Sequence, residues 1–513
     1  MSRLRGHNLR AAGTAAPTEG ARVMSPPIRT GHTAGILGLA LAGCCLPLAA
    51  LGAMPKVIFT PWHADGIYRL GAKAGWTVTV PRGAPDPRGR FRYIIKRNDL
   101  EVIKTGSFSL ESGQARFGTT LHTPAMLYVV VTYQPAFAAI PRRDCARLDR
   151  NVKALLIKAD PSVRALLARH RHDQPLARRF ACAANPERRV TTLGAAVAPT
   201  LLRPSLPPPP NFRTFWAAQL AALARVPIRA KLTALPTAQT GVKLFRVRLR
   251  SLDSDVRGYL SMPDRPGKFP ALIIYQYAGV YPLKTAWATN RAAEGWLTFD
   301  VDSHDISPSR GKGVPPNYQT LGDHSPETSY FLDMYLRDTR ALQYIRRSPY
   351  WNGKTLVLTG VSMGGQQSLA TAGLNPGKES AVIVDEPSGA DMNGLAHGRR
   401  PGYPFFTTTD PAVLHTAEYF DTVNFAPYIT APTLIAMGFI DPIAPPAGIW
   451  TELNEIPAPK EAVPLIDSSH MNITPDEQAP WLQRSEELLA ELAHGGKFLP
   501  NQALTRPATR RVR

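Results

Sequence analysis

The chain has 513 residues, enough for two or three domains with a sizeable hydrophobic core. Its formal net charge is +21, yet Lys and Arg exceed Asp and Glu only before residue 192 and after residue 496, and the two kinds nearly balance between these positions. Because no basic and aromatic nucleic-acid motif accompanies the charge, a nucleic-acid partner is disfavoured, and the basic parts favour peripheral contact with an anionic envelope surface or acidic polysaccharide.

Residues 1–53 have the pattern of a secretory signal peptide. A polar start is followed by an apolar run over 34–50, and small residues follow that run as cleavage positions. We therefore expect an exported protein, periplasmic or secreted. Leu41-Ala-Gly-Cys44 also fits a lipoprotein signal anchored at Cys44, whereas Gly residues and Pro47 interrupt the run too early for a membrane span.

Residues 54–140 predict a β-sandwich. Runs rich in β-branched and aromatic residues, such as Trp76–Val80, Phe91–Ile95 and Leu127–Tyr133, alternate with Gly and Pro turns. The length suits an immunoglobulin-like module, although the Cys-Trp-Cys signature of antibody domains is missing. We interpret this segment as an accessory domain.

Residues 141–205 form a basic insert and a linker. Two short amphipathic helices are expected between residues 152 and 169, and the prolines of 204–210 indicate a stiff connection. Cys145 and Cys182 are the cysteines that remain once a signal peptide is removed. In an exported protein they are candidates for a disulfide bond.

Residues 206–496 alternate strand and helix, which predicts an α/β fold with a mostly parallel sheet covered by helices on both faces. A basic tail, 497–513, follows. In such sheets ligands bind beyond the carboxyl ends of the strands. The expected strands are 271–275, 296–300, 355–360, 381–385, 432–438 and 462–466, and the expected helices are 212–226, 329–346 and 480–494.

A nucleophile elbow is predicted where the strand 355–360 runs into Gly360-Val-Ser362-Met-Gly364 and then into a helix. The small residues around Ser362 allow the sharp turn that exposes its hydroxyl above the sheet. Because the helix begins at this point, the backbone N–H of Met363 can donate to a developing oxyanion.

An acid and a base follow in the chain order that an α/β-hydrolase requires. Asp441 stands in the loop after the strand 432–438, and His470 stands in the loop after the next strand. A serine hydroxyl needs a base to take its proton, and the base needs a carboxylate to fix its tautomer. Ser362, Asp441 and His470 are therefore the predicted catalytic triad.

Three segments together resemble the acetyl xylan esterase and cephalosporin C deacetylase family of α/β-hydrolases: Phe420–Ala426, Gly438–Pro446 and the GVSMGG elbow. The similarity runs from about residue 208 to about residue 494. It implies a serine esterase that removes acetyl groups from sugars or xylan-like polysaccharide and needs no cofactor.

The chain departs from the family pattern around the site. Met363 replaces the usual Gln after the nucleophile, and Met471 replaces the usual Glu after the histidine. The loop that supplies the second oxyanion donor usually reads His-Gly but here has Gln276 and Tyr277, so we expect the N–H of Tyr277 to serve. Further candidates for the substrate pocket are Gln276, Tyr281 and His304.

Other interpretations remain open. The group Asp300, Asp302, His304 and Asp305 has ligand types that suit a divalent ion, but hydrogen bonding within a loop at the rim of the pocket is favoured and no metal site is assigned. A peptidase or lactone hydrolase on the same fold is the alternative enzyme. A catalytically silent carbohydrate-binding homologue is the alternative outside enzymes.

Overall fold

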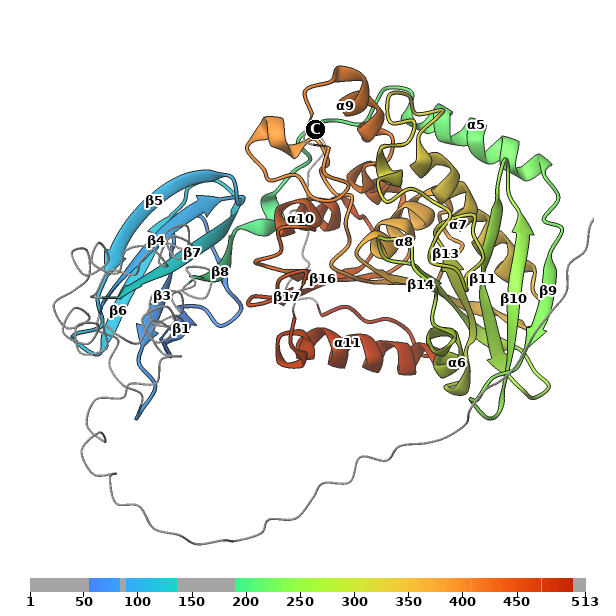
Figure 1. Ribbon diagram of the computed structural model, residues 1–513, viewed down its shortest axis with the longest axis horizontal. Helices are drawn as coiled ribbons and strands as arrows, with labels where there is room; N and C mark the ends of the chain where they lie inside the picture. The colour runs from blue at the N-terminus through green and yellow to red at the C-terminus, as the bar shows by residue number, and fades with distance from the viewer. Residues whose placement is uncertain (1–54, 84–88, 136–189, 407, 472, 502–513) are drawn as a thin grey trace, which may run out of the picture. The chain divides into compact units, whose positions relative to one another are not determined.

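The computed structural model describes residues 55–83, 89–135, 190–406, 408–471 and 473–501 (Figure 1). The predicted signal peptide with Cys44, the two amphipathic helices, and the cysteine pair Cys145 and Cys182 lie outside the described residues. None of the described helices is long and apolar enough to cross a membrane.

The first part of the described chain is a β-sandwich, as predicted. Its strand β4 alternates buried Phe91, Tyr93 and Ile95 with exposed Arg92 and Ile94, so one face of the strand packs into the sandwich core. The smaller sheet has the order β1 (Ile58–Pro61), β3 (Lys73–Thr79), β6 (Gln114–Thr120), and the larger has the order β2 (Ile67–Tyr68), β8 (Val190–Val197), β7 (Ala125–Pro135), β4 (Gly89–Arg97), β5 (Glu101–Phe108).

Strand β8 extends the sandwich beyond the predicted boundary at residue 140. It pairs antiparallel with β7 and parallel with β2, so the last strand of the sandwich comes after residues 136–189 in the chain. The 141–205 segment is therefore not wholly insert and linker. Residues such as Thr192, Gly194 and Ala195 are small, and without alternating large apolar residues this strand has a weak signal in the sequence.

The second part is built on a nine-stranded sheet, which confirms the predicted α/β fold. Strands β12 to β17 pair in parallel and are almost wholly buried, whereas β9, β10 and β11 form an antiparallel extension that was not predicted. The order is β17 (Lys460–Leu465), β16 (Thr433–Gly438), β15 (Ala381–Asp385), β14 (Trp351–Val361), β12 (Phe269–Tyr275), β13 (Leu297–Asp302), β11 (Asp255–Pro263), β10 (Val242–Arg250), β9 (Lys231–Leu235).

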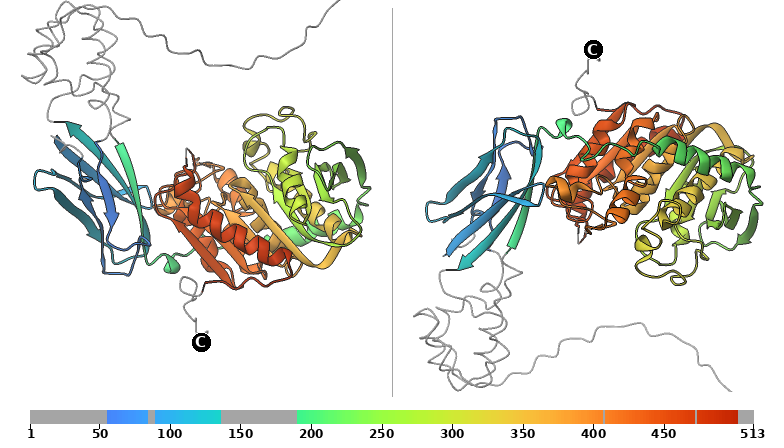
Figure 2. Two further views of the ribbon diagram at one scale, coloured as in Figure 1. Left: turned by 90° about the horizontal axis from the view of Figure 1, so that it is seen from below. Right: turned by 90° about the horizontal axis from the view of Figure 1, so that it is seen from above.

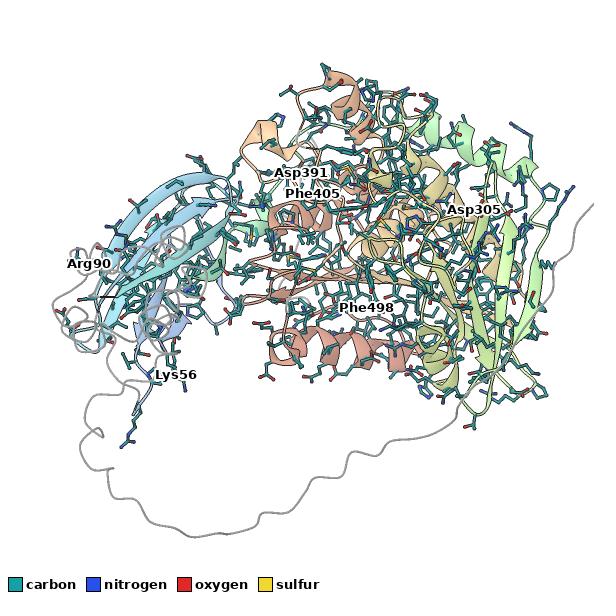
Figure 3. All side chains as sticks on the ribbon, viewed as in Figure 1. Lys56, Arg90, Asp305, Asp391, Phe405 and Phe498 are labelled. Carbon is teal, nitrogen blue, oxygen red and sulfur yellow. The ribbon has the colours of Figure 1, made fainter. Side chains whose placement is uncertain are left out.

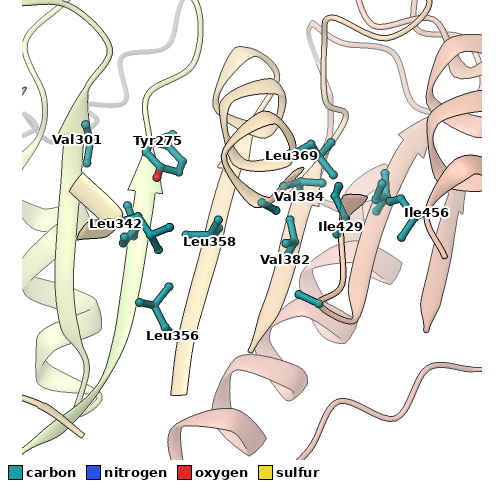
Figure 4. Packing of buried hydrophobic residues seen from close by; sticks show 14 of the residues in the cluster. Tyr275, Val301, Leu342, Leu356, Leu358, Leu369, Val382, Val384, Ile429 and Ile456 are labelled. Atoms are coloured by element: carbon teal, nitrogen blue, oxygen red, sulfur yellow. The ribbon is translucent and has the colours of Figure 1, made fainter. Parts of the chain in front are cut away.

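Helices cover both faces of this sheet, with α6 and α11 on one side and α7, α8 and α10 on the other (Figures 1 and 2). Alternate residues of the strands supply the two cores. Leu272 and Val357 pack with α11, whereas Ile273 and Leu358 pack with α7 and α8 (Figure 4). The helices are α5 (Phe212–Arg225), α6 (Thr285–Ala293), α7 (Tyr330–Arg347), α8 (Met363–Leu374), α9 (Pro411–Glu418), α10 (Pro446–Glu455) and α11 (Pro475–Ala493).

Helix α11 begins five residues before its predicted start, and its N-terminus explains why. The side chain of Thr474 accepts from the N–H of Glu477, and the carboxylate of Glu477 accepts from the N–H of Thr474. This capping box, with Pro475 in the first turn, sets the start of the helix. Beyond the end of the helix, Phe498 packs into the core between α11 and the sheet (Figure 3).

The sandwich contacts the second part of the chain directly. Met126 and Ala196 of the sandwich belong to the same buried cluster as residues of the nine-stranded sheet. A Cβ on Gly194 of the sandwich would lie 2.4 Å from Cβ of Phe439. Arg400 donates to the carboxylate of Asp99 at the tip of the β4–β5 hairpin. The proline-rich segment 204–210 thus joins parts that pack together.

Candidate active site

Ser362 occupies a strained turn between β14 and α8, as the elbow motif predicts. Its backbone has φ 56° and ψ −121°, a region that residues other than glycine rarely adopt. A Cβ on Gly360 would lie 2.3 Å from the backbone of Gly364, and one on Gly364 would lie 2.1 Å from the carbonyl oxygen of Tyr275. Glycine at both positions therefore allows the turn to close against the neighbouring strand.

The structure brings the three predicted triad residues into one chain of hydrogen bonds. Nε2 of His470 lies 2.9 Å from Oγ of Ser362, and Nδ1 lies 2.7 Å from Oδ2 of Asp441. Since a carboxylate only accepts, Nδ1 carries the proton and Nε2 is free to accept the proton of the serine. This is the tautomer that a general base needs.

Asp441 is fixed by its own loop. Its other oxygen, Oδ1, accepts from the N–H groups of Ile443 and Ala444 at 2.7 and 2.9 Å, and only 1% of the residue is exposed. These bonds compensate the burial of the carboxylate and leave Oδ2 directed at the imidazole. The side chain therefore holds His470 in one orientation.

The two predicted oxyanion donors come from segments that pack against each other. Met363 begins α8, and the tight contact of Gly364 with Tyr275 brings this helix N-terminus against the segment that leads to Tyr277. Within the described residues, the N–H groups of Met363 and Tyr277 make no hydrogen bond to protein. Both N–H groups are thus available to an oxyanion.

Gln276 points into the protein. Its Oε1 accepts from the N–H of Ser303, its Nε2 donates to the carbonyl of Tyr281, and 2% of the residue is exposed. Tyr281 lies partly buried, donates to the carbonyl of Tyr277, and stacks on the Tyr277 ring at 4.5 Å. These contacts fix the shape of the loop and leave Tyr277 exposed at its surface.

His304 is fully buried beneath the same loop. Nε2 faces the carbonyl of Gly279 at 3.1 Å and therefore donates, so Nδ1 accepts from the hydroxyl of Tyr330 at 2.7 Å. Burial lowers the pKa of His304 to about 4, which keeps the ring neutral. Burial also raises the pKa of Asp302 to about 7. His304 thus takes part in loop hydrogen bonding.

Tyr318 and Tyr403 belong to the site but were not predicted. The hydroxyl of Tyr318 accepts from the N–H of Gly279 at 3.1 Å and lies 3.0 Å from the hydroxyl of Tyr403. Both hydroxyls lie 3.4 Å from Sδ of Met363. They connect the oxyanion loop to the residue after the nucleophile, and no motif in the sequence marks them, since Tyr318 begins a short 3-10 helix and Tyr403 lies in a turn.

Glu386 is the second feature that sequence reasoning missed. It follows the last residue of β15, is 2% exposed, and places Oε2 3.6 Å from Nδ1 of His470. Burial, followed by the charges of Asp385 and Asp441, raises its pKa to about 9. The available signal was its position at the carboxyl end of a central parallel strand.

A cleft of about 630 Å³ opens beside the elbow, between α6 and α11. The ring of Tyr277 lies 6.0 Å from the ring of Trp287, and both line the cleft. Its lining mixes apolar and polar side chains, among them Gln276, Tyr277, Trp287, Asn290, Val361 and Leu489. The cleft thus combines aromatic faces with hydrogen-bonding groups, and its lining includes Val361, the residue before the nucleophile.

Comparison with known families agrees with this geometry. Residues 201–484, more than half of the chain, match the family model described as acetyl xylan esterase (AXE1). The chain belongs to the acetyl xylan esterase family. It is 30% identical over 308 residues to the acetyl esterase Axe7A of Xylanibacter ruminicola, and this match covers 56% of the chain and 70% of the relative. The chain is thus a carboxylic ester hydrolase by family.

Solved structures support the fold of this acetyl xylan esterase family member. The acetyl xylan esterase of Paenibacillus sp. R4 superposes with a TM-score of 0.51 at 22% identity, covering 57% of the chain and 98% of that structure. Acetyl xylan esterase 1 of Thermoanaerobacterium sp. JW/SL YS485 gives a TM-score of 0.50 at 18% identity, covering 57% and 97%. The predicted α/β-hydrolase fold is confirmed.

Proposed function

We propose that this protein removes acetyl groups from xylan-type polysaccharide with Ser362 as nucleophile, His470 as general base and Asp441 as the acid that orients the base. The observation that carries the proposal is the hydrogen-bonded chain Ser362–His470–Asp441, at 2.9 and 2.7 Å, on a strained elbow. The family membership supports the ester substrate.

In the first half of the reaction, Oγ of Ser362 attacks the acetyl carbonyl while Nε2 of His470 takes the hydroxyl proton. The N–H groups of Met363 and Tyr277 donate to the oxyanion that forms. His470 then returns the proton to the sugar oxygen that leaves, and the acetyl group stays on Ser362. Asp441 stabilises the imidazolium that exists between these two steps.

In the second half, water attacks the acetyl-enzyme and the same groups act in the same roles. His470 takes a proton from the water, the oxyanion again receives the two backbone N–H groups, and collapse releases acetate and restores the Ser362 hydroxyl. The residues present suffice for these steps.

The substrate class is also supported by a group of aromatic rings on the loop that carries Tyr277 and on α6. Tyr277, Tyr281 and Trp287 have ring centroids 4.5 to 6.4 Å apart, and Tyr277 and Trp287 line the cleft beside the elbow. Amphipathic aromatic rings suit the apolar face of a sugar, while Asn290 suits its hydroxyl groups. We infer that the sugar next to the acetylated one lies over these rings.

The test compares the wild type with Ser362→Ala and His470→Ala on p-nitrophenyl acetate and on acetylated xylo-oligosaccharides. Either substitution should lower kcat by about 10⁴-fold or more, with the circular dichroism spectrum unchanged. Ser368→Ala, which alters a buried hydroxyl on the same helix, is the matched control and should keep its activity. A Ser362→Ala protein with more than about a tenth of wild-type activity would contradict the assignment.

A substrate panel separates the proposal from its alternatives. Acetylated xylo-oligosaccharides, an aminoacyl amide and a simple lactone distinguish an acetyl esterase from a peptidase or lactone hydrolase. Binding of the oligosaccharides without release of acetate would instead indicate a catalytically silent carbohydrate-binding protein.

We also propose that the protein is exported, because residues 1–53 have a polar start, an apolar run and small residues at the end. N-terminal sequencing of the mature protein tests this. A start near residue 54 is expected, a lipid-modified Cys44 would indicate an anchored lipoprotein, and an intact first residue would contradict export.

A further inference from the structure

Glu386 places a second carboxyl group beside the imidazole of His470. Its Oε2 is 3.6 Å from Nδ1, the atom that donates to Asp441. One carboxylate oxygen of Glu386, one of Asp441 and one imidazole nitrogen of His470 all lie within 4.8 Å of one another. Glu386 comes from the end of β15, whereas Asp441 comes from the loop after β16. The segments that follow two neighbouring strands thus each place a carboxyl group near Nδ1 of His470.

The surroundings of this carboxyl group are shaped to hold it. A Cβ on Gly438, at the end of β16, would lie only 2.7 Å from Oε1 of Glu386, so glycine at this position leaves room for the acid. The backbone N–H of Glu386 donates to the carbonyl of Ala436, although φ is 43°. The hydroxyl of Ser468 lies 3.4 Å from Oε1.

We propose that Glu386 is a second acid of the triad, which helps to position His470 and takes over the N–H of Nδ1 when Asp441 is absent. The inference rests on the proposed catalytic role of His470. Glu386 touches neither the substrate nor the reacting atoms, so it is a positioning residue that acts through the imidazole.

The charges around Glu386 explain how two acids share one base. The groups that face it are the acids Asp385 and Asp441, the imidazole of His470, and the uncharged Ser468 and Gln478. Burial and the neighbouring acids raise its pKa to about 9, so Glu386 is protonated near neutral pH. Removing Asp441 removes one of these charges and makes ionisation of Glu386 easier.

A metal ion bound by these three residues is disfavoured by the bonds that they already make. Oδ1 of Asp441 accepts from two backbone N–H groups, and Nδ1 of His470 carries a proton that it donates to Oδ2. A metal at Nδ1 would require loss of that proton and would displace the bond to Asp441. The arrangement therefore fits two acids and a protonated Nδ1.

The experiment is a double-mutant cycle of Asp441→Ala and Glu386→Gln, measured as kcat on p-nitrophenyl acetate. Removing the acid of a triad that has only one costs about 10⁴-fold. With Glu386 as the second acid, Asp441→Ala should cost only about 10²-fold, Glu386→Gln less than about 5-fold, and the double variant about 10⁴-fold. The combined loss thus exceeds the product of the single losses.

The pH profile distinguishes an acid from a packing residue. In Asp441→Ala, the rising limb of the pH–activity profile should lie at higher pH than in the wild type. The reason is that Glu386 must lose its proton before it can accept from Nδ1. The double variant should lack this limb. Glu379→Gln, which changes a buried carboxyl group just before the start of β15, is the control and should leave both rate and profile unchanged.

Two results would overturn the proposal. One is a loss of about 10⁴-fold in Asp441→Ala alone with no further loss in the double variant, and the other is an unshifted pH profile in Asp441→Ala. Failure of the proposed function is seen separately, because in that case either the wild type would have no esterase activity or Ser362→Ala would keep it, whatever the cycle shows. Circular dichroism of each variant confirms that the chain is folded.

Discussion

The hydroxyl of Tyr318 lies 3.4 Å from the sulfur of Met363 and accepts from the N–H of Gly279. It thus joins the residue after the nucleophile to the loop that carries Tyr277. Both segments supply a proposed oxyanion donor, and their relative position is set by one buried phenol. The substitution of Met363 for the usual Gln of the family is accommodated by this phenol and by Tyr403.

Tyr318→Phe should therefore lower kcat by about 3- to 10-fold and leave KM for p-nitrophenyl acetate nearly unchanged, because the donors matter most for the oxyanion of the transition state. Steady-state kinetics measures the effect. Tyr350→Phe, at an exposed position, is the control. If kcat and KM fall equally, or if neither changes, Tyr318 does not position the donors.

Trp287→Ala should raise KM for acetylated xylo-oligosaccharides by about 5- to 20-fold, corresponding to loss of one stacked aromatic ring of about 1–2 kcal/mol. KM for p-nitrophenyl acetate should change less than 2-fold, since this ester has no neighbouring sugar. The two substrates are compared in the same protein preparation. If both KM values rise together, the ring supports the loop and does not bind the sugar.

His304 makes part of the stability depend on pH. Its pKa is about 4 in the folded chain and about 6.5 when free, so below about pH 6.5 the unfolded chain binds a proton that the folded chain does not. Stability falls from that pH down to about pH 4, by on the order of 3 kcal/mol. Urea unfolding at pH 7 and pH 4.5 should show a smaller drop for His304→Asn than for the wild type, and equal drops would contradict the assignment.

Arg400 ties the sandwich to the loop of the triad acid. Nη1 donates to Asp99 at 2.7 Å, Nε donates to the carbonyl of Pro442 at 3.1 Å, and the backbone N–H donates to the carbonyl of Asn98. Pro442 follows Asp441 directly. The hairpin tip is suited to this contact because Asn98 and Asp99 both have φ 51°.

Arg400→Ala should lower stability by about 1–2 kcal/mol and kcat by about 3-fold, because the Asp441 loop loses a support. Denaturant unfolding and ester hydrolysis measure the two effects. Arg92→Ala removes an exposed Arg from the same sandwich and should change neither. If Arg400→Ala behaves like Arg92→Ala, the contact does not support the acid loop.

The sequence predicted the central strands because they are continuous apolar runs that end in turns, and the elbow because glycines flank Ser362 in a fixed pattern. Apolar and polar residues alternate in Val242–Arg250, which is also typical of a strand. This local pattern does not show which strands it pairs with, and in the structure these are β9 and β11. Strand β8 is rich in small residues and follows residues 136–189 in the chain, so its pairing depends on contacts that no local pattern encodes.

The residues of the site likewise include some that the sequence predicts and some that it does not. The triad order follows from the fold, since acid and base must leave the carboxyl ends of successive strands. Tyr318 and Tyr403 act through packing between segments far apart in the chain, and a Tyr in such a segment has no distinctive sequence neighbours, whereas Glu386 had only its position after a central strand as a signal. Gln276, predicted as a pocket residue, is among the residues that line the cleft, although it is 2% exposed and its Oε1 accepts from the N–H of Ser303.

The central claim is that Ser362 is an activated nucleophile that carries the acetyl group. Labelling of the full chain with a fluorophosphonate, followed by peptide mass spectrometry, tests it without knowledge of the natural substrate. We expect one adduct, on the peptide that contains Ser362, formed at a rate that falls by at least about 10³-fold in His470→Ala and blocked by prior incubation with an acetyl ester. An unlabelled wild-type chain, or a label on another serine that survives Ser362→Ala, would contradict the account.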